Sequence, residues 1–268
     1  MINHDEGKST FMRSMKYILG SIRVLLVLFN TALQVGILLV DGWINGVSIE
    51  RRFMHRRRWA RTSTWLLGIR LDEHTGTISD QPALIISNHR TLLDPVIQAA
   101  YLDAYIIAKA SVSKLPMISQ GARLTGIIFV KRDKLKSRHA ARLKSEEVLK
   151  SGQNVLVYAE GTTYATQRTG KFKIGTFGIA ADLNIPVIPI TIEYPEAKDF
   201  WFEGSMARQI FGQVGAWRTR AKLRIGAPIK NTEAKVLLEQ IQSHIDQNLL
   251  EMQDGWSEVF TKVIPENV

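Results

Sequence analysis

His89 and Asp94 are the two residues whose types and spacing best fit acid–base chemistry in this chain. They lie in the segment Ser87-Asn88-His89-Arg90-Thr91-Leu92-Leu93-Asp94-Pro95, directly after the apolar run Ala83-Leu84-Ile85-Ile86. A histidine with a carboxylate in reach can act as a general base, because the carboxylate fixes its tautomer and its orientation. The pair is therefore a candidate general base with its orienting partner.

The spacing limits how these two side chains can meet. Positions i and i+5 of one helix point about 140° apart, so the pair cannot face each other on a continuous helix. We expect His89 on the turn after a strand and Asp94 in the first turn of the next helix. An isolated pair is more often a surface histidine beside a helix-start aspartate, so the other motifs have to decide.

A second apolar run, Ile127–Lys131, leads into a basic residue that could bind an anion. Arg132 follows this run, and its planar guanidinium can bind a phosphate through two hydrogen bonds. The segment Gly170-Lys171-Phe172-Lys173 likewise places Lys173 at the start of a predicted helix, where an anion is favoured. A solvated strand end explains Arg132 equally well when it is taken alone.

A third apolar run, Asn154–Ala159, leads into Glu160, Gly161 and Thr162. The glycine allows the backbone to approach a ligand closely, and the Glu160 carboxylate could accept a hydrogen bond from a ligand hydroxyl. A tight turn is an equally good local explanation.

Strand and helix patterns alternate from about residue 70, which predicts an α/β domain built on a mixed sheet with flanking helices. The predicted strands are Ala83–Ser87, Tyr105–Lys109, Ile127–Lys131, Asn154–Ala159, Val187–Glu193 and Lys222–Ile225. The predicted helices are Thr91–Asp103, Leu135–Lys150, Ile174–Leu183 and Thr232–Met252. Pro186 and Pro189 indicate a strand that starts late or lies at a sheet edge, and Asp199–Gly215 shows no clear pattern.

Composition and charge narrow the class of protein. The 268 residues include no cysteine, which excludes a disulfide scaffold, a Cys-ligated zinc site and a thiol nucleophile. The net charge of +10 suits nucleic acid or an anionic membrane surface. An arginine cluster follows the most apolar segment, as in proteins that bind anionic lipids, and we expect no nucleic-acid partner because no such motif is present. This cluster consists of Arg51, Arg52, Arg56, Arg57, Arg58 and Arg61.

We expect three regions: a mobile N-terminus (1–10), a membrane-associating helical hairpin or span with the arginine cluster (11–69) and an α/β domain (70–268). The apolar stretch Val24–Val40 is near the lower length limit for a membrane span. Its three polar interruptions are Asn30, Thr31 and Gln34. Basic residues on both flanks favour a monotopic hairpin over a single span, and both over a soluble core helix. The proposed interfacial anchors are Trp43, Trp59 and Trp65.

Four motifs in order resemble those of the glycerolipid acyltransferase family, typified by 1-acyl-glycerol-3-phosphate acyltransferases. They are Asn88-His89-xxxx-Asp94, Gly126-xx-Phe129-Val130-x-Arg132, Glu160-Gly161-Thr162 and Ile185-Pro186-Val187-Ile188-Pro189. The resemblance covers roughly residues 80–230 and includes the apolar lead-in.

The resemblance implies an enzyme of the cytoplasmic membrane face that transfers an acyl chain from acyl-CoA or acyl-carrier protein to a lysolipid hydroxyl. His89 would be the general base and Asp94 its partner, and no cofactor or metal would be needed. Arg132, Glu160, Gly161, Thr162 and Lys173 would bind the acceptor. The sequence agrees with direct transfer, since it has neither a cysteine nor a Gly-x-Ser-x-Gly motif.

One departure from the family pattern leaves the acceptor open. Thr163 stands where phosphatidate-forming members usually carry an arginine, and Arg168, Lys171 or Lys173 could compensate for the lost charge. The alternatives are another headgroup such as a lyso-ornithine lipid, a transacylase that needs no CoA, and a basic lipid-binding protein without catalysis.

Overall fold

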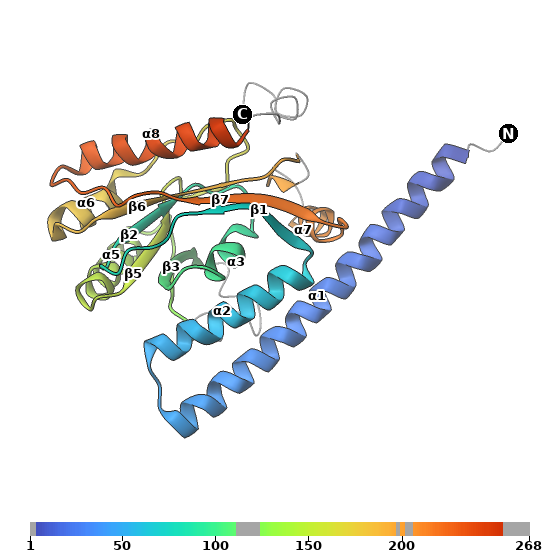
Figure 1. Cartoon of the computed structure of the whole chain (residues 1–268), viewed down its shortest axis with the longest axis horizontal. Coiled ribbons are helices and arrows are strands. Elements are labelled where there is room, and N and C mark those ends of the chain that lie inside the picture. The colour runs from blue at the N-terminus through green and yellow to red at the C-terminus, as the bar shows by residue number, and fades with distance from the viewer. Residues whose placement is uncertain (1–3, 111–123, 197–198, 202–205, 254–268) are drawn as a thin grey trace.

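The computed structural model describes residues 4–110, 124–196, 199–201 and 206–253. Two long helices, α1 (His4–Asn45) and α2 (Ile49–Leu66), precede an α/β domain (Figure 1). The strands are β1 (Ile69–Thr75), β2 (Leu84–Ser87), β3 (Ala104–Lys109), β4 (Ile127–Val130), β5 (Asn154–Tyr158), β6 (Val187–Glu193) and β7 (Thr219–Ile225). The remaining helices are α3 (Asp94–Ala99), α5 (Leu135–Lys150), α6 (Ile174–Leu183), α7 (Met206–Val214) and α8 (Ala234–Met252).

The strands form one mixed sheet in the order β1-β7-β6-β2-β5-β3-β4. All neighbouring pairs are parallel except β6 and β7, so β1 and β7 run opposite to the other strands. Five parallel strands therefore bring their carboxyl ends to the same sheet edge, where open α/β sheets bind their ligands. The segments that follow β2, β4 and β5 carry the predicted site residues, so this topology gathers them at one edge.

Both faces of the sheet are covered by helices, which explains the uninterrupted apolar runs of its central strands. Side chains of β2 alternate between two cores: Ile85 faces the one with α3, whereas Leu84 and Ile86 face the one with α5, α6 and α8. Figure 1 shows α8 and α6 on one side of the sheet, with α3 and α2 on the other. The predicted fold class is confirmed.

The N-terminal segment is a helical hairpin in which α2 packs back along α1 (Figure 1). Two of the polar interruptions in the apolar stretch join the helices: Asn30 Nδ2 donates to Ser63 Oγ (3.0 Å), and Thr31 Oγ1 accepts from Trp59 Nε1 (2.9 Å). Trp59 is thus an interhelical contact, and its predicted role as an interfacial anchor is wrong. Trp43 and Trp65 are exposed.

Most arginines of the α2 cluster, which was expected to bind anionic lipid, make contacts inside the protein. Arg56 is buried, and its guanidinium donates to the backbone carbonyls of Leu102, Ala104 and Thr125 (2.7–2.9 Å). Arg57 pairs with Asp103, and Arg51 and Arg61 donate to backbone carbonyls. These contacts fasten α2 to the α/β domain and to the end of α1, and they take Arg56 out of any lipid-facing surface, whereas Arg58 and Arg61 are exposed.

Several element boundaries differ from the sequence prediction. The helix predicted at Thr91–Asp103 is the short α3, which starts at Asp94. Strand β1 was missed, and α7 lies inside Asp199–Gly215, where no pattern was found. Helix α1 begins at His4, within the stretch expected to be mobile. Strand β6 starts directly after Pro186, as expected, but it is a central strand of the sheet. Pro189, which has no N–H group, lies just before the residues of β6 that pair with β7, and its carbonyl accepts from the Gly226 N–H. The proline therefore leaves no gap in the β6–β7 hydrogen bonds.

Candidate active site

His89 and Asp94 meet at the carboxyl end of β2. His89 Nδ1 lies 2.7 Å from Asp94 Oδ2, with His89 on the turn and Asp94 at the start of α3. A carboxylate can only accept, so Nδ1 carries the proton and Nε2 keeps its lone pair. The imidazole is slightly accessible, at 13% of its side-chain surface, whereas Asp94 is fully buried. Nε2 is therefore the atom of this pair that can take a proton from a ligand.

The Asp94 carboxylate is held by four donors. Its Oδ2 accepts from the backbone N–H groups of Arg90 (2.6 Å) and Thr91 (2.9 Å) as well as from His89. Its Oδ1 accepts from the Tyr194 hydroxyl at 2.7 Å. Donors to the charged form favour it and fix its direction, so Asp94 can orient the imidazole and stabilise an imidazolium.

Asn88 and Tyr158 fix the turn that carries His89. Asn88 is fully buried and extends β2 by exchanging two 2.9 Å hydrogen bonds with the backbone of Ile192. The Tyr158 ring stacks on the imidazole with the ring centroids 4.2 Å apart, and its hydroxyl donates to Gln98 Oε1. These contacts restrict the rotation of His89 before any substrate arrives.

Glu160 joins this turn to the loop after β5. Its Oε2 accepts from the His89 backbone N–H (2.7 Å) and its Oε1 from the Gly170 N–H (3.0 Å). Burial raises the pKa of Glu160 to about 8, opposed by the charge of Arg90 and by these two N–H donors. Glu160 is buried, and both of its oxygens accept from backbone N–H groups, so in this structure it holds the turn; its contact with a ligand hydroxyl stays a prediction.

Two cations converge on Gly161 beside the dyad. Arg132 Nη1 donates to the Gly161 carbonyl, and the Lys173 side chain fills the place that a Cβ at Gly161 would occupy. Gly161 has a φ of +79°, a left-handed conformation that glycine adopts without strain. Arg132 is half-buried and Lys173 is exposed, so an anion could reach both. Burial lowers the pKa of Arg132 from its usual value.

The remaining predicted positions belong to the loop between β5 and α6. Thr162 is exposed and Thr163 is half-buried on the same loop, and both Arg168 and Lys171 are exposed. The loop folds over the dyad turn, since the Tyr164 N–H donates to the His89 carbonyl at 2.9 Å. The structure thus brings together the dyad, Glu160, Gly161, Arg132 and Lys173, and Thr162 follows Gly161 on the same loop.

Sequence reasoning missed a buried ion pair directly under the site. Arg90 and Glu193 are both fully buried, with Arg90 Nη2 at 2.8 Å from Glu193 Oε2. Arg90 Nη1 also donates to the carbonyls of Tyr164 (3.0 Å) and Thr166 (2.7 Å). Arg90 therefore ties the dyad turn to β6 and to the loop between β5 and α6. A carboxylate at the end of the apolar run Val187–Glu193 was the available signal for it.

The fold and the site agree with the family that the four motifs resemble, and comparisons with known proteins point to the same family. Residues 69–193 match the model of the Acyltransferase family. The fold is similar to the crystal structure of the 1-acyl-sn-glycerophosphate acyltransferase of Thermotoga maritima, with a TM-score of 0.64 and 18% identity. That likeness covers 87% of this chain and 98% of the other. Over residues 69–193 the chain is thus similar to the Acyltransferase family, and over most of its length it shares the fold of the Thermotoga maritima enzyme.

Curated relatives include two kinds of lysolipid acyltransferase. The chloroplastic 1-acyl-sn-glycerol-3-phosphate acyltransferase of Arabidopsis thaliana is 32% identical over 64% of this chain and 46% of its own length. The 1-acyl-sn-glycerol-3-phosphate acyltransferase of Borreliella burgdorferi is 29% identical over 52% of this chain and 58% of its own length. The lyso-ornithine lipid O-acyltransferase of Rhizobium meliloti is 30% identical over 47% of this chain and 43% of its own length. The chain thus spans about half of the length of these relatives.

Proposed function

We propose that the protein is an O-acyltransferase that moves an acyl chain from a thioester to the free hydroxyl of a lysophospholipid. The observation that carries the proposal is the 2.7 Å contact between His89 Nδ1 and Asp94, which leaves Nε2 as a base at the sheet edge. The family match and the lysolipid relatives support the same reaction.

The proposed reaction is one direct displacement. His89 Nε2 takes the proton of the acceptor hydroxyl, and the alkoxide oxygen attacks the thioester carbonyl carbon. The C–S bond then breaks, and the thiolate of CoA or acyl-carrier protein takes the proton back from the imidazolium. Asp94 stabilises the imidazolium between these two transfers. We propose that the reaction needs no resident cofactor or metal, since the thioester is itself the co-substrate.

We propose 1-acyl-glycerol-3-phosphate as the acceptor, with its phosphate held by Arg132 and Lys173 above Gly161. The two side chains converge there and are accessible to an anion. Thr163 leaves a lyso-ornithine lipid as the second candidate acceptor, and a lyso-ornithine lipid O-acyltransferase is among the relatives.

An acceptor panel separates these proposals. Purified protein in mixed micelles is given radiolabelled acyl-CoA or acyl-carrier protein, then each lysolipid, and products are identified by mass. Product formed without any thioester donor would instead indicate a transacylase, and no product with any acceptor would overturn the proposed function.

Replacing Arg132 by methionine should lower kcat/KM for 1-acyl-glycerol-3-phosphate by about 10- to 100-fold. A hydrogen bond to a charged group typically contributes about 1.5–3 kcal/mol. An acceptor that lacks a phosphate, such as monoacylglycerol, should lose much less. Arg138→Met is the matched control because Arg138 is exposed on α5. Equal losses with both acceptors would contradict a phosphate role for Arg132.

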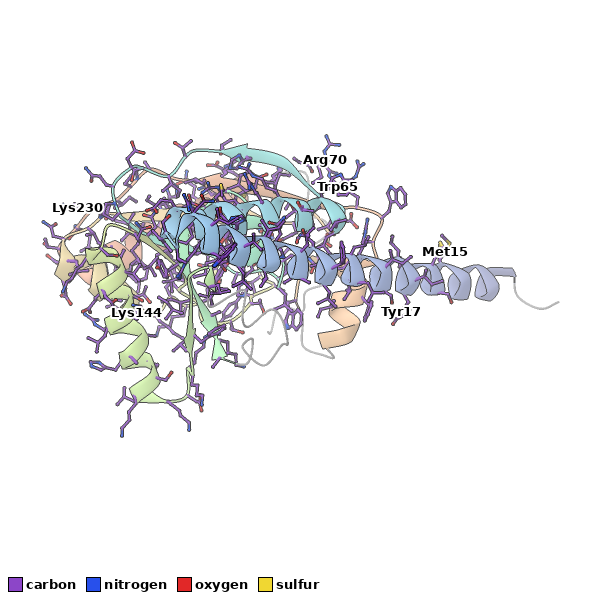
Figure 2. The ribbon with its side chains drawn as sticks, turned by 90° about the horizontal axis from the view of Figure 1, so that it is seen from below. Met15, Tyr17, Trp65, Arg70, Lys144 and Lys230 are labelled. Carbon is purple, nitrogen blue, oxygen red and sulfur yellow. The ribbon has the colours of Figure 1, made fainter. Side chains whose placement is uncertain are left out.

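We further propose that α1 is embedded in the cytoplasmic leaflet of the membrane without crossing it, on the side where acyl thioesters are available. The segment Ser14–Asn45 is long and apolar enough to cross a membrane, and only 17% of its most apolar window is buried. Figure 2 shows Met15 on the part of α1 that extends past α7. A perpendicular span of Val24–Val40 would carry the charged α2 into the hydrocarbon, at roughly 2.5–3.5 kcal/mol per arginine, so the monotopic placement is favoured.

Charges introduced on the exposed face of α1 should release the protein from membranes. Phe29 and Leu33 are exposed on this face at 69% and 48%. The double variant Phe29→Glu, Leu33→Glu should move from the membrane pellet to the supernatant and should not float with liposomes. Leu143→Glu on α5 is the matched control, since Leu143 is equally exposed on the α/β domain. Unchanged flotation of the double variant would refute this placement.

A further inference from the structure

A chain of contacts links helix α1 to the dyad through α7. Its first step is Arg23, which is buried against the last turn of α7 and the residues after it. The Arg23 guanidinium donates to the carbonyls of Val214 (2.9 Å), Ala216 and Trp217 (2.9 Å). Carbonyls at a helix carboxyl end have no partner inside the helix and favour a cation, so Arg23 caps α7.

Close packing of two glycines fixes α7 on α1. A Cβ at Gly215 would collide with the backbone carbonyls of Lys16 and Phe211, and a Cβ at Gly20 would lie 2.9 Å from the Phe211 ring. The Tyr17 and Phe211 rings also pack, with centroids 5.9 Å apart. Any rotation of α1 about its axis must therefore move the end of α7.

The second step runs from α7 to the dyad turn through Gln213. Gln213 is buried; its Oε1 accepts from the Thr91 hydroxyl at 2.6 Å, and its Nε2 donates to the Asp199 carbonyl at 3.0 Å. Thr91 is also buried, and its N–H donates to Asp94 Oδ2 at 2.9 Å. Thr91 thus contacts Gln213 through its side chain and the dyad carboxylate through its backbone.

We propose that Arg23 and Gln213 are positioning residues that couple the seating of α1 to the orientation of the His89–Asp94 dyad. The proposal rests on the proposed function. Under it, α1 attaches the protein to the membrane and also determines how well the Asp94 carboxylate is held. A displacement of about 1 Å in a catalytic group can cost roughly a hundredfold in rate, so a contact this far from the chemistry can matter.

The test compares kcat, KM, membrane binding and local hydrogen exchange in full-length variants. Gln213→Leu and Thr91→Val each remove the hydroxyl–amide contact, and Arg23→Met removes the cap of α7. We expect each to lower kcat about tenfold, with KM changed by less than about twofold, because substrate contacts are intact. Liposome flotation should stay unchanged. Thr91→Ser keeps a hydroxyl and should restore activity relative to Thr91→Val.

Hydrogen exchange gives a readout that does not need activity. The amides of Arg90 and Thr91 donate to Asp94, so the peptide that spans residues 88–95 should exchange faster in Gln213→Leu and in Arg23→Met. A peptide from β5 should keep its rate. Gln247→Leu and Arg138→Met are the matched controls, since both side chains are exposed on other helices.

The outcomes distinguish the two proposals. An inactive wild-type protein overturns the proposed function, whereas exchange of residues 88–95 still tests the coupling. Wild-type activity with unchanged kcat and unchanged exchange in all three variants overturns the coupling alone. Faster exchange everywhere, with loss of thermal stability, would show a general structural role and would also overturn it.

Discussion

His89→Ala should lower turnover by about a hundred- to ten-thousand-fold, because it removes the base that takes the acceptor proton. The dyad geometry makes the companion variant informative. In Asp94→Asn the amide oxygen should take the place of Oδ2, because the Arg90 and Thr91 N–H groups also donate there. The imidazole then keeps its orientation but loses the negative charge that stabilises the imidazolium, so turnover should fall by less than in His89→Ala. Acyl-CoA-dependent product formation measures both effects.

The control for this prediction is His139→Ala. His139 is exposed on α5, and its loss should leave turnover unchanged. Circular dichroism and thermal melts should show that His89→Ala remains folded, since the imidazole packs mainly on Tyr158. Full activity in His89→Ala would exclude His89 as the general base.

Arg90→Met should destabilise the folded protein by about 3–5 kcal/mol, because it leaves the buried carboxylate of Glu193 without its partner. The free energy of unfolding, measured by urea denaturation in mild detergent, tests this value. The double variant Arg90→Met, Glu193→Gln removes both charges and should recover much of the loss. A single variant as stable as the wild type would contradict the structural role of this pair.

The loss in Arg90→Met should also depend on pH. Burial raises the pKa of Glu193, and the positive charge of Arg90 opposes that rise. Without Arg90 the folded-state pKa rises further above the unfolded value, so the folded state binds more protons than the unfolded state in that range. Stability then falls as pH increases, and the difference from the wild type should be larger at pH 8 than at pH 5. A difference that grows toward acid pH would have the wrong sign.

Long uninterrupted apolar runs made the central strands predictable. The runs before His89 and Glu160 are β2 and β5, which are buried on both faces and can tolerate few polar side chains. Strand β1 was missed because it lies at the sheet edge and alternates exposed polar residues such as Arg70 with half-buried ones. Helix α3 has six residues, too few for a helical period to define its start.

The residue types of the site were predictable, but several of their roles were not. His89, Asp94 and Arg132 follow or flank buried strands, and parallel strands end at a common edge. Glu160 looked equally suited to a ligand hydroxyl and to a backbone amide, and only the fold supplies the His89 and Gly170 N–H groups that occupy it. The arginines of α2 looked like a lipid-binding surface until the fold placed backbone carbonyls around Arg56.

The sequence by itself determined the fold class, the position of the apolar helix and the pair His89–Asp94, because these follow from local patterns of burial and from spacing. The tertiary structure decided which groups hold that pair. Tyr194 and Gln213 lie about one hundred residues or more from the turn they support, as the separations of 100 from Asp94 and 122 from Thr91 show. Hydrogen bonds between such distant segments depend on how strands and helices pack, and no local pattern encodes that packing.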